Sequence, residues 1–590
     1  MLWNVAVAST SRVIADPRKR PHVLARVRAQ RRSMVVTMAE STHVDRWLRA
    51  RRHAVRASPW VILVTAKLWL VDGQRLTAYG SLTIDDQWFV ERASWISAGR
   101  WLGPFDAYTL IKQPGYPLFV AAVHELRMPL LLAHQLVYVF AIGIMIVALR
   151  PLLPTRLRRL WVFALLLFNP MTMNAPISAR VDRAGIYPAL TILVLACLVG
   201  LVCSCDRPRR TAAAWGLATS LSIGALWLVR EEWLLVLPAL ACGLVLAIVR
   251  LVRSSLPPAL RVLAAVGVAG VPLSIVVGVL CLDGVNDSRY GLRINNVEQT
   301  SMSAGLGPMF RVAPATTFDQ FPVTVETREL IYAVSPHFAG LRDEIERGGG
   351  LRFASVRPDG VSDLGGQVFQ WVVLDAIGAT GRATTAVELD VTFHAIADEI
   401  NAACDDGRLQ CGAQHSGIAP AWRWSRVPGL MARTLTGLRR TIDLSAFTAL
   451  SPDGDGTAAD RALFSRMTNE PLAPGPNGFF TRQRVHLISA FRWLYRLLAL
   501  VAIVVALARA RSAVRDRRAA IWTMSPMSTV VILGALLVLV RVIGLAYLDL
   551  TAFPAFSPTY LASGYAVALV VATAVALGRT TRGIGAGQTA

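Results

Sequence analysis

Charged residues are scarce in this sequence, and lysine is almost absent. Asp, Glu, Lys and Arg make up 17% of the 590 residues, and only Lys19, Lys67 and Lys112 among the 61 basic residues are lysines. Soluble domains hold about 25% charged residues. Apolar residues reach 54% and gather in long runs that end in arginines or polar loops. Because roughly 20 apolar residues in a helix cross a bilayer, the sequence predicts a multi-pass membrane protein.

Motifs of several common site types are also missing. The nine histidines show no His-x-x-His or other recurring metal-ligand spacing, so a fixed zinc site is not expected. No Walker A motif, Rossmann glycine fingerprint or Gly-x-Ser-x-Gly elbow occurs in a strand-to-helix context. The net charge of +23 comes without an RNP, zinc-finger or basic-helix signature, so nucleic acid is not an expected partner.

Ten apolar segments are predicted to span the membrane, which gives an all-α polytopic fold. They are residues 58–72, 128–149, 160–176, 185–204, 212–229, 232–251, 260–282, 488–508, 526–548 and 556–578. Seven of them, with an outside loop at 73–127, form a first module over residues 58–282. The last three form a C-terminal group over 485–578. Residues 1–57 and 579–590 are predicted to be cytoplasmic tails, the first of them basic and disordered.

The arginines predict the orientation in the cell membrane. With the N-terminus in the cytoplasm, all five inside segments carry arginine clusters, as the positive-inside rule requires, and the opposite loops are acidic or balanced. Both termini are then cytoplasmic. Residues 283–484 form a large extracytoplasmic domain of mixed α/β or irregular structure, with one helix expected from Val387 to Ala403.

The seven cysteines fall into two groups. Five lie in or beside apolar segments, where a thiol behaves as a small apolar side chain. Cys404 and Cys411 lie in the large polar region with six residues between them. An extracytoplasmic location would allow them to form a disulfide, and two free thiols are the alternative.

Two adjacent carboxylates, Asp85 and Asp86, stand in the first outside loop. Trp88 and Trp95 follow seven residues apart, on one face of a predicted helix. This pattern is typical of an interfacial helix, which would hold the acidic pair at the depth of the lipid headgroups. The alternative is a solvated acidic turn beside ordinary interfacial aromatic residues.

Three further groups of charges are predicted to lie on the same side of the membrane. Lys112 precedes a Pro-Gly-Tyr-Pro turn, where its ammonium could neutralise a phosphate; a lysine that snorkels to the interface is the alternative. The other two groups are Arg180-Val181-Asp182-Arg183 and Arg230-Glu231-Glu232. Ion pairs that brace helices would explain each of these alone, but their convergence on one side favours a functional site.

Together these motifs resemble the GT-C membrane glycosyltransferases, in particular bacterial relatives of the protein O-mannosyltransferases and lipid A aminoarabinose transferases. The Asp-Asp pair, the Lys-x-Pro-Gly-Tyr-Pro-Leu-Phe segment and the Arg-Glu-Glu turn carry the resemblance. It covers about residues 58–280, with a looser match in the last three spans. Residues 283–484 have no counterpart, and many members have Asp-Glu in place of Asp-Asp.

The resemblance implies transfer of a sugar, with inversion, from a polyprenyl-phosphate carrier to an extracytoplasmic glycan, lipid or protein. Asp85 would be the catalytic base, and Asp86 would orient the acceptor or hold a divalent cation. The donor phosphate would be held by Lys112 and Arg183, with Arg230 assisting. The residues implied to position that arginine or bind the sugar are Asp182, Glu231 and Glu232.

Two other functions remain open. A transporter or flippase of a lipid-linked substrate would carry charges within its spans and broken helices in two related halves. The sequence predicts neither, since the charges cluster at span ends. A catalytically silent relative, whose outer domain binds cell-wall polymer or a partner protein, is the third candidate, because a motif does not establish activity.

Overall fold

The computed structural model describes residues 57–206, 211–312, 320–412, 422–444, 447–473, 479–515 and 525–578. The chain divides into two compact units, Met1–Thr65 and Ala66–Ala590. Of the first unit, only the helical residues 57–65 are described. The predicted tails, apart from Ala57, lie outside the described residues.

The structure confirms an all-α polytopic membrane protein. In the described part of the chain, eight helices are long and apolar enough to cross a membrane. They are α5 (Leu130–Ala148), α8 (Tyr187–Ser204), α9 (Thr211–Val229), the continuous η3 (Glu231–Val236) and α10 (Leu237–Val252), α11 (Pro258–Tyr290), α20 (Phe479–Arg515), α21 (Pro526–Thr551) and α22 (Pro558–Leu577).

Two of the ten predicted spans are helical but short. The helix Ala57–Val71 falls below the length of a crossing helix. The segment predicted at 160–176 is interrupted: α6 (Arg156–Leu167) ends before Asn169, and the short helices η1 (Pro170–Met173) and α7 (Ala175–Ser178) follow. Pro170 cannot donate a backbone hydrogen bond, and the Asn169 side chain accepts one from the Met171 N–H instead.

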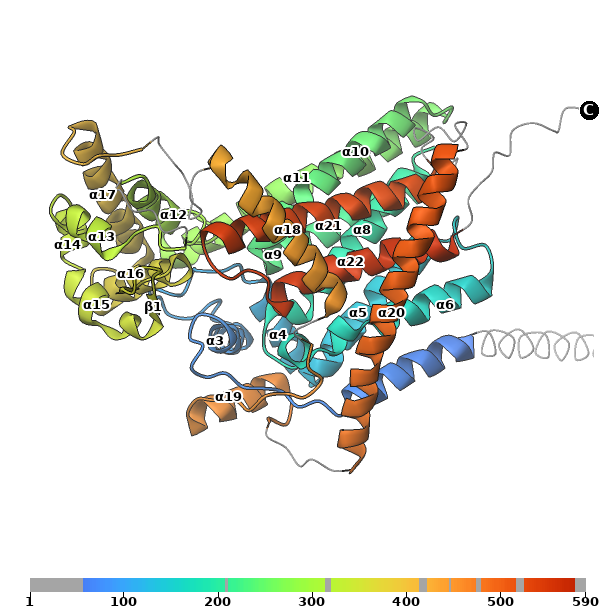
Figure 1. The fold of residues 1–590 in the computed structure, drawn as a ribbon, viewed down its shortest axis with the longest axis horizontal. Helices are drawn as coiled ribbons and strands as arrows, with labels where there is room; N and C mark the ends of the chain where they lie inside the picture. The colour runs from blue at the N-terminus through green and yellow to red at the C-terminus, as the bar shows by residue number, and fades with distance from the viewer. Residues whose placement is uncertain are drawn as a thin grey trace, which may run out of the picture. The chain divides into compact units, whose positions relative to one another are not determined.

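Helix α8 is the centre of the bundle and α20 lies at its edge. In α8, 94% of the apolar stretch that could cross the membrane is buried inside the protein. This helix packs against α5, α9, α10, α21 and α22. The corresponding share in α20 is 11%. Figure 1 shows α8, α21 and α22 running side by side while α20 crosses them steeply. An exposed apolar helix of this kind faces lipid.

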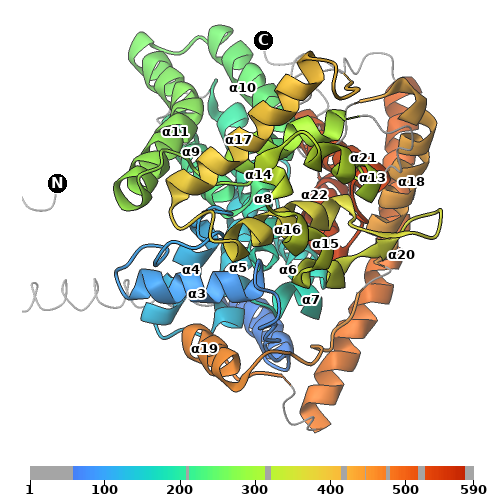
Figure 2. The same ribbon diagram turned by 90° about the vertical axis from the view of Figure 1, so that its left-hand side faces the viewer.

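The segment after α11, predicted to be mixed α/β or irregular, consists mostly of short helices in its described residues. It contains α12 (Ser301–Leu306), η4 (Gly307–Arg311), α13 (Val325–Tyr332), α14 (Pro336–Ala339), α15 (Arg342–Arg347), η5 (Gly349–Phe353), α16 (Gly366–Ala379) and α17 (Ala386–Asp405). Strands β1 (Ser355–Val356) and β2 (Ser362–Asp363) form one antiparallel pair. These elements gather beyond one end of the long helices (Figures 1 and 2).

Helix α17 is the one predicted from sequence at 387–403. The Thr385 hydroxyl and the Glu388 carboxylate form a capping box at its start, which satisfies backbone N–H groups of the first turn. Just before its end, Cys404 forms a disulfide with Cys411. Cys411 also pairs as an isolated bridge with Val312, so the end of α17 is joined to the strand-like residue after η4.

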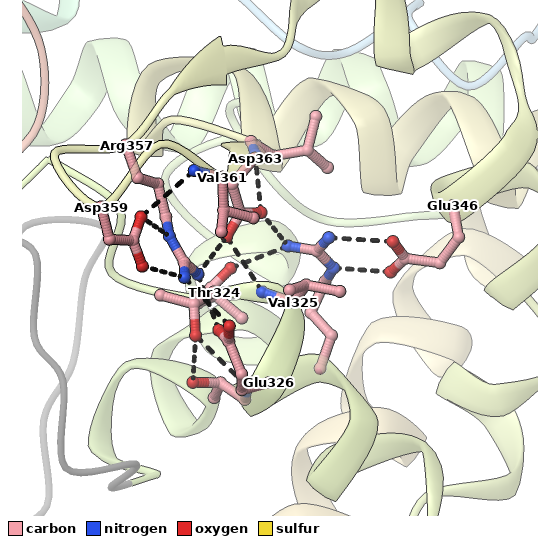
Figure 3. A network of polar contacts seen from close by, with 12 residues as sticks. Thr324, Val325, Glu326, Glu346, Arg357, Asp359, Val361 and Asp363 are labelled. Atoms are coloured by element: carbon pink, nitrogen blue, oxygen red, sulfur yellow. Dashed lines mark hydrogen bonds and ion pairs between the residues drawn. The ribbon is translucent and has the colours of Figure 1, made fainter.

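A buried ionic network centred on Asp363 holds this segment together (Figure 3). The Asp363 carboxylate is fully buried and accepts from Arg328 Nη1 at 2.8 Å and Arg357 Nη1 at 3.0 Å. Arg328 also bonds both oxygens of Glu346, and Arg357 bonds both oxygens of Glu326 and of Asp359; these partners are shown in Figure 3. The backbone N–H groups of Val325 and Leu364 complete the shell of the central carboxylate.

The later parts of residues 283–484 pack on the membrane-spanning helices and on the first loop. After η6 (Trp424–Arg426), helix α18 (Val427–Asp443) runs along α21. Residues 447–473, which include α19 (Ala458–Thr468), pair with the first loop through the bridges Leu76↔Leu472 and Tyr79↔Asp455. These contacts support the loop that carries the predicted acidic pair.

Candidate functional site

The acidic pair begins a buried helix in the first loop. Helix α3 (Asp86–Ser97) starts directly after Asp85, and α4 (Gly115–Glu125) packs against it. The predicted interfacial face is wrong at Trp88, which is 1% exposed and donates to the Tyr108 carbonyl at 2.7 Å. Helix α3 is therefore positioned by packing within the protein. Trp88 does not contact the lipid headgroups as predicted.

Lys112 lies against Asp85. Its ammonium donates to the Asp85 carboxylate and to the Ile84 carbonyl, and it lies 5.2 Å from the centre of the Phe89 ring. Lys112 is buried, so it does not snorkel, whereas 40% of the Asp85 side chain is exposed. Asp85 is the N-cap residue of α3, but its carboxylate accepts no hydrogen bond from the first turn of the helix. It accepts from Lys112 instead.

Asp86 is bound on both oxygens by Arg180. The Arg180 Nε donates to Oδ1 at 3.0 Å and Nη2 donates to Oδ2, which forms a two-point ion pair. Asp86 is fully buried, and the Arg180 guanidinium stacks 4.9 Å from the Tyr79 ring. Hydrogen bonding from the Thr77 N–H to the Ala179 carbonyl joins the two backbones beside this pair.

The Arg180–Arg183 segment continues the network toward α10. Arg183 Nη1 donates to Glu231 Oε1 at 2.6 Å, and its guanidinium lies 5.8 Å from the Phe89 ring. Asp182 caps the short helix η2 (Arg183–Gly185) by accepting from the Ala184 N–H at 2.6 Å. The structure therefore brings Arg183 to the Arg-Glu-Glu turn, while Asp182 is engaged by backbone.

Arg230 is buried with part of its guanidinium unused. Its Nη2 pairs with Glu232 Oε1 at 2.7 Å, and its ring contacts are Tyr187 at 5.2 Å and Tyr560 at 5.1 Å. The side chain is 3% exposed, yet Nε and Nη1 have no hydrogen-bond partner among the described residues. Buried donors without partners cost free energy, so these two nitrogens are free to bond a further acceptor.

A second arginine from a distant helix completes this turn. Arg541, in α21, donates to Glu232 Oε2 at 2.7 Å and to the Tyr560 carbonyl at 2.7 Å. The prediction that charges stay at span ends is therefore wrong at Arg541, which lies within a candidate span. Its isolation in an apolar run was the available sequence signal, since intramembrane charges are rare unless they are used.

The predicted residues meet at one end of the helical bundle. Helices α8, α10 and α22 begin there, and α9, α11 and α21 end there. Gly115 makes the approach of α4 to α9 possible, since a Cβ at this position would lie 2.4 Å from the Leu228 carbonyl oxygen. The predicted site residues gathered there are Asp85, Asp86, Lys112, Asp182, Arg183, Arg230, Glu231 and Glu232.

One member of the cluster had no sequence signal. Glu298 follows α11 and interacts electrostatically with Glu231, Arg183, Lys112 and Asp85. Burial, followed by the charge of Glu231, raises the pKa of Glu298 to about 7. The residue stands alone in an irregular stretch of a region without a recognised counterpart, so no spacing pattern pointed to it.

The two neighbouring aspartates have opposite electrostatic environments. Burial raises the pKa of Asp86 to about 7 in spite of Arg180. Burial also acts to raise the pKa of Asp85, but Lys112, Arg183 and Arg180 outweigh it and lower the value to about 2. Asp85 is thus the carboxylate that stays ionised at neutral pH.

No grouping of three or more His, Cys, Asp or Glu side chains suited to a metal ion occurs among the described residues. The carboxylate expected to hold a divalent cation, Asp86, has both oxygens bonded to Arg180. A cation at Asp86 would therefore have to displace the guanidinium.

No protein-family model and no curated protein matches the sequence. Among solved structures, apo ArnT from Cupriavidus metallidurans aligns with 88% of this chain and 78% of its own, at 15% identity and a TM-score of 0.30. The undecaprenyl phosphate complex of ArnT covers the same shares, at 14% identity and a TM-score of 0.29.

Proposed function

We propose that this protein is a membrane glycosyltransferase that moves a sugar from a polyprenyl-phosphate donor to an extracytoplasmic acceptor. The observation that carries the proposal is Arg230, a buried arginine of which two nitrogens bond no acceptor in the part of the chain that the structure describes. It lies between two candidate spans, where the phosphate of a lipid carrier would enter from the bilayer.

A phosphate group fits this guanidinium better than a neutral ligand does. Arginine binds phosphate oxygens through paired N–H groups, and such charged hydrogen bonds are the strong ones in proteins. The rings of Tyr187 and Tyr560 and the carboxylate of Glu232 hold the guanidinium in place. The arginine is therefore oriented before the ligand arrives, so less freedom is lost on binding.

Asp85 is the base in this proposal. The acceptor hydroxyl attacks the anomeric carbon, its proton passes to the Asp85 carboxylate, and the bond from carbon to the phosphate oxygen breaks with its electron pair remaining on the lipid phosphate. The product is inverted at the anomeric carbon. Because the leaving group is an anion, it needs cations more than it needs an acid.

Lys112 links the base, Asp85, to the donor phosphate. In the structure its ammonium neutralises Asp85 and keeps the pKa of that carboxyl low, which makes Asp85 a weak base. A donor phosphate that attracts the ammonium releases the carboxylate and strengthens it as a base. Arg183, only a few ångströms from the Phe89 ring that Lys112 also contacts, would share the phosphate charge.

Asp86 is a positioning residue in this scheme. Its carboxylate binds Arg180 and fixes the start of α3, which carries Asp85. Glu231 and Glu232 hold Arg183 and Arg230 in the same way, and Asp182 orders the turn between the two arginines of its segment.

The test is donor turnover by the purified, detergent-solubilised protein. Labelled polyprenyl-phosphate sugars, together with a cell-envelope extract as the source of acceptor, are incubated with wild type, Asp85→Asn and the control Asp343→Asn, whose carboxylate is exposed in α15. We expect turnover by wild type and the control, and a loss of about 10²–10⁴-fold in Asp85→Asn, the usual contribution of a general base.

Three results would count against the proposal. Equal turnover by wild type and Asp85→Asn would remove Asp85 from the catalytic role. Donor binding without turnover by wild type would identify a silent relative. Movement of intact donor across reconstituted vesicles would favour a flippase, a function that a charge within a span such as Arg541 would also suit.

A further inference from the structure

The segment after α11 places a carboxylate against the charged cluster. The Val297 N–H donates to the Leu110 carbonyl at 2.7 Å, so Glu298 follows a backbone contact two residues from Lys112. On the other side, Gln370 of α16 donates from Nε2 to Glu298 Oε1 at 3.5 Å. The Tyr108 hydroxyl donates to Asp375 at 2.8 Å, which joins α16 to the same stretch of the first loop.

Charged groups from several elements face Glu298. Lys112 and Asp85 come from the first loop, Arg183 from η2, and Glu231 from the start of η3. Burial and the neighbouring Glu231 favour the neutral carboxyl, while the two cations favour the ionised form. The balance raises the pKa of Glu298 to about 7, so the group changes charge near neutral pH.

The carboxyl of Glu298 is poorly satisfied for a structural residue. Among the described residues its only hydrogen bond is the long one from Gln370, and it forms no ion pair there. Gln370 itself is buried with Oε1 unpartnered, and Asn296, two residues before Glu298, is buried with Nδ2 unpartnered. The same small region thus offers a carboxyl, an amide acceptor and an amide donor.

We propose that Glu298 and Gln370 bind hydroxyl groups of the transferred sugar, so that the segment after α11 supplies sugar recognition to the phosphate-binding end of the bundle. Carboxyl and amide groups suit this ligand because a sugar hydroxyl both donates and accepts hydrogen bonds. The inference rests on the proposed function, since the sugar is the part of the donor beyond the phosphate at Arg230.

The test compares the affinity of two ligands, polyprenyl phosphate and polyprenyl-phosphate sugar, by quenching of tryptophan fluorescence in detergent. The gain in affinity from the sugar is the measured quantity. We expect Glu298→Gln to reduce this gain about tenfold or more while the affinity for bare polyprenyl phosphate stays the same. Gln370→Leu should reduce it less. Glu344→Gln, an exposed change in α15, is the control and should match wild type.

The pH dependence provides a readout that a structural role would not produce. Relative to Glu298→Gln at the same pH, the wild-type gain should rise as pH increases through about 7, because the ionised carboxyl is the stronger acceptor. Comparison at equal pH removes the titration of the phosphate monoester of the bare lipid, whose second pKa is about 6. In Glu298→Gln, which mimics the neutral carboxyl, the gain should stay low at every pH. Glu298→Asp should restore part of the pH dependence, and matching gel-filtration profiles should show that each variant is folded.

The outcomes separate the two proposals. Binding of both ligands, with a sugar-dependent gain that Glu298→Gln leaves unchanged, would overturn the role of Glu298 and leave the proposed function intact. The absence of any gain in wild type would do the same. Failure of wild type to bind either ligand would overturn the proposed function, and the role of Glu298 would fall with it.

Discussion

Two buried arginine clusters in this protein differ in how completely their donors are used. Around Asp363, every guanidinium nitrogen of Arg328 and Arg357 has an acceptor, and the central carboxylate is shared between them (Figure 3). At the end of the bundle, Arg230 uses one nitrogen for Glu232, and two others lack a partner in the described chain.

The difference separates a network whose donors are all used within the fold from one that, under the proposed function, receives a ligand. Leaving a buried donor unpaired costs about 1–3 kcal/mol, more for a charged group, and an acceptor from a ligand would remove that cost. The Asp363 cluster has no capacity left for a ligand. The Arg230 cluster has capacity for one acceptor group with at least one oxygen.

The largest effect expected from this comparison is on stability at Asp363. Asp363→Ala leaves two buried guanidinium groups without their shared acceptor, and loss of one member of a buried ionic network costs about 3–5 kcal/mol. We expect a clear fall in the thermal unfolding midpoint of the purified protein and easier proteolysis after α11. Affinity for bare polyprenyl phosphate per folded molecule should change little, because Arg230 pairs with Glu232, which is not part of this cluster.

Asp343→Ala is the matched control for this change. Its partner Arg347 is exposed, as Asp343 is, and exposed pairs contribute little. Equal midpoints for Asp363→Ala and Asp343→Ala would show that the buried network does not hold the segment together. The Asp363 cluster could then no longer be contrasted with Arg230 as a structural network.

Much of this architecture follows from the sequence because the bilayer imposes simple rules. Apolar length identified the eight helices that the structure has as candidate spans. It overcounted at 160–176, where composition is apolar but Asn169 and Pro170 end the helix and direct the chain into short turns. A hydropathy value is an average over many residues, so it does not detect that one residue, Pro170, lacks the N–H that a continuing helix needs.

Charged residues at span ends predicted the site better than they predicted the pairs within it. Lys112 and Arg183 both lie against Phe89, and Arg230 interacts electrostatically with Arg183. Which carboxylate each one binds depends on helix packing. Asp85 and Asp86 are adjacent in sequence and yet differ in burial, because a helix that starts between them turns one inward and leaves the other partly exposed.

The contributions of distant segments could not be predicted. Arg541 reaches Glu232 from α21, and Glu298 reaches the cluster after a helix of 33 residues. Such contacts depend on tertiary packing between elements hundreds of residues apart, for which one sequence carries no local pattern. Arg541 alone had a signal, as a charge inside an apolar run.

The second effect is on donor affinity at Arg230. Arg230→Gln removes the charge and most of the fork of donors, so polyprenyl phosphate should bind about 10–100-fold more weakly, the value of one or two charged hydrogen bonds. Arg230→Lys should lose less, since the charge remains without the paired geometry. Fluorescence titration measures both, with Arg439→Gln, an exposed change in α18, as the control.

The thermal unfolding midpoint should rise slightly in Arg230→Gln, whereas it should fall in Asp363→Ala. Removal of a guanidinium that already has unpaired donors relieves part of their cost, and Glu232 keeps Arg541 as its partner. The comparison between the two clusters would break if Arg230→Gln lowered the unfolding midpoint as much as Asp363→Ala does and left the affinity for polyprenyl phosphate unchanged.

The smallest effect at neutral pH, and the one that tests the coupling within the site, is expected from Lys112→Met. The ammonium opposes the effect of burial on Asp85 and holds the pKa of that carboxyl at about 2. Without it burial is less opposed, so the pKa of Asp85 rises.

A carboxylate base works only when ionised, and activity is lost as pH falls through its pKa. The acid limb of the profile of kcat/KM against pH, which reports the free enzyme, should therefore move to higher pH in Lys112→Met. Lys112→Arg should keep it near the wild-type position. If Lys112 acted on the donor phosphate alone, Lys112→Met would weaken donor binding and leave the position of the acid limb unchanged.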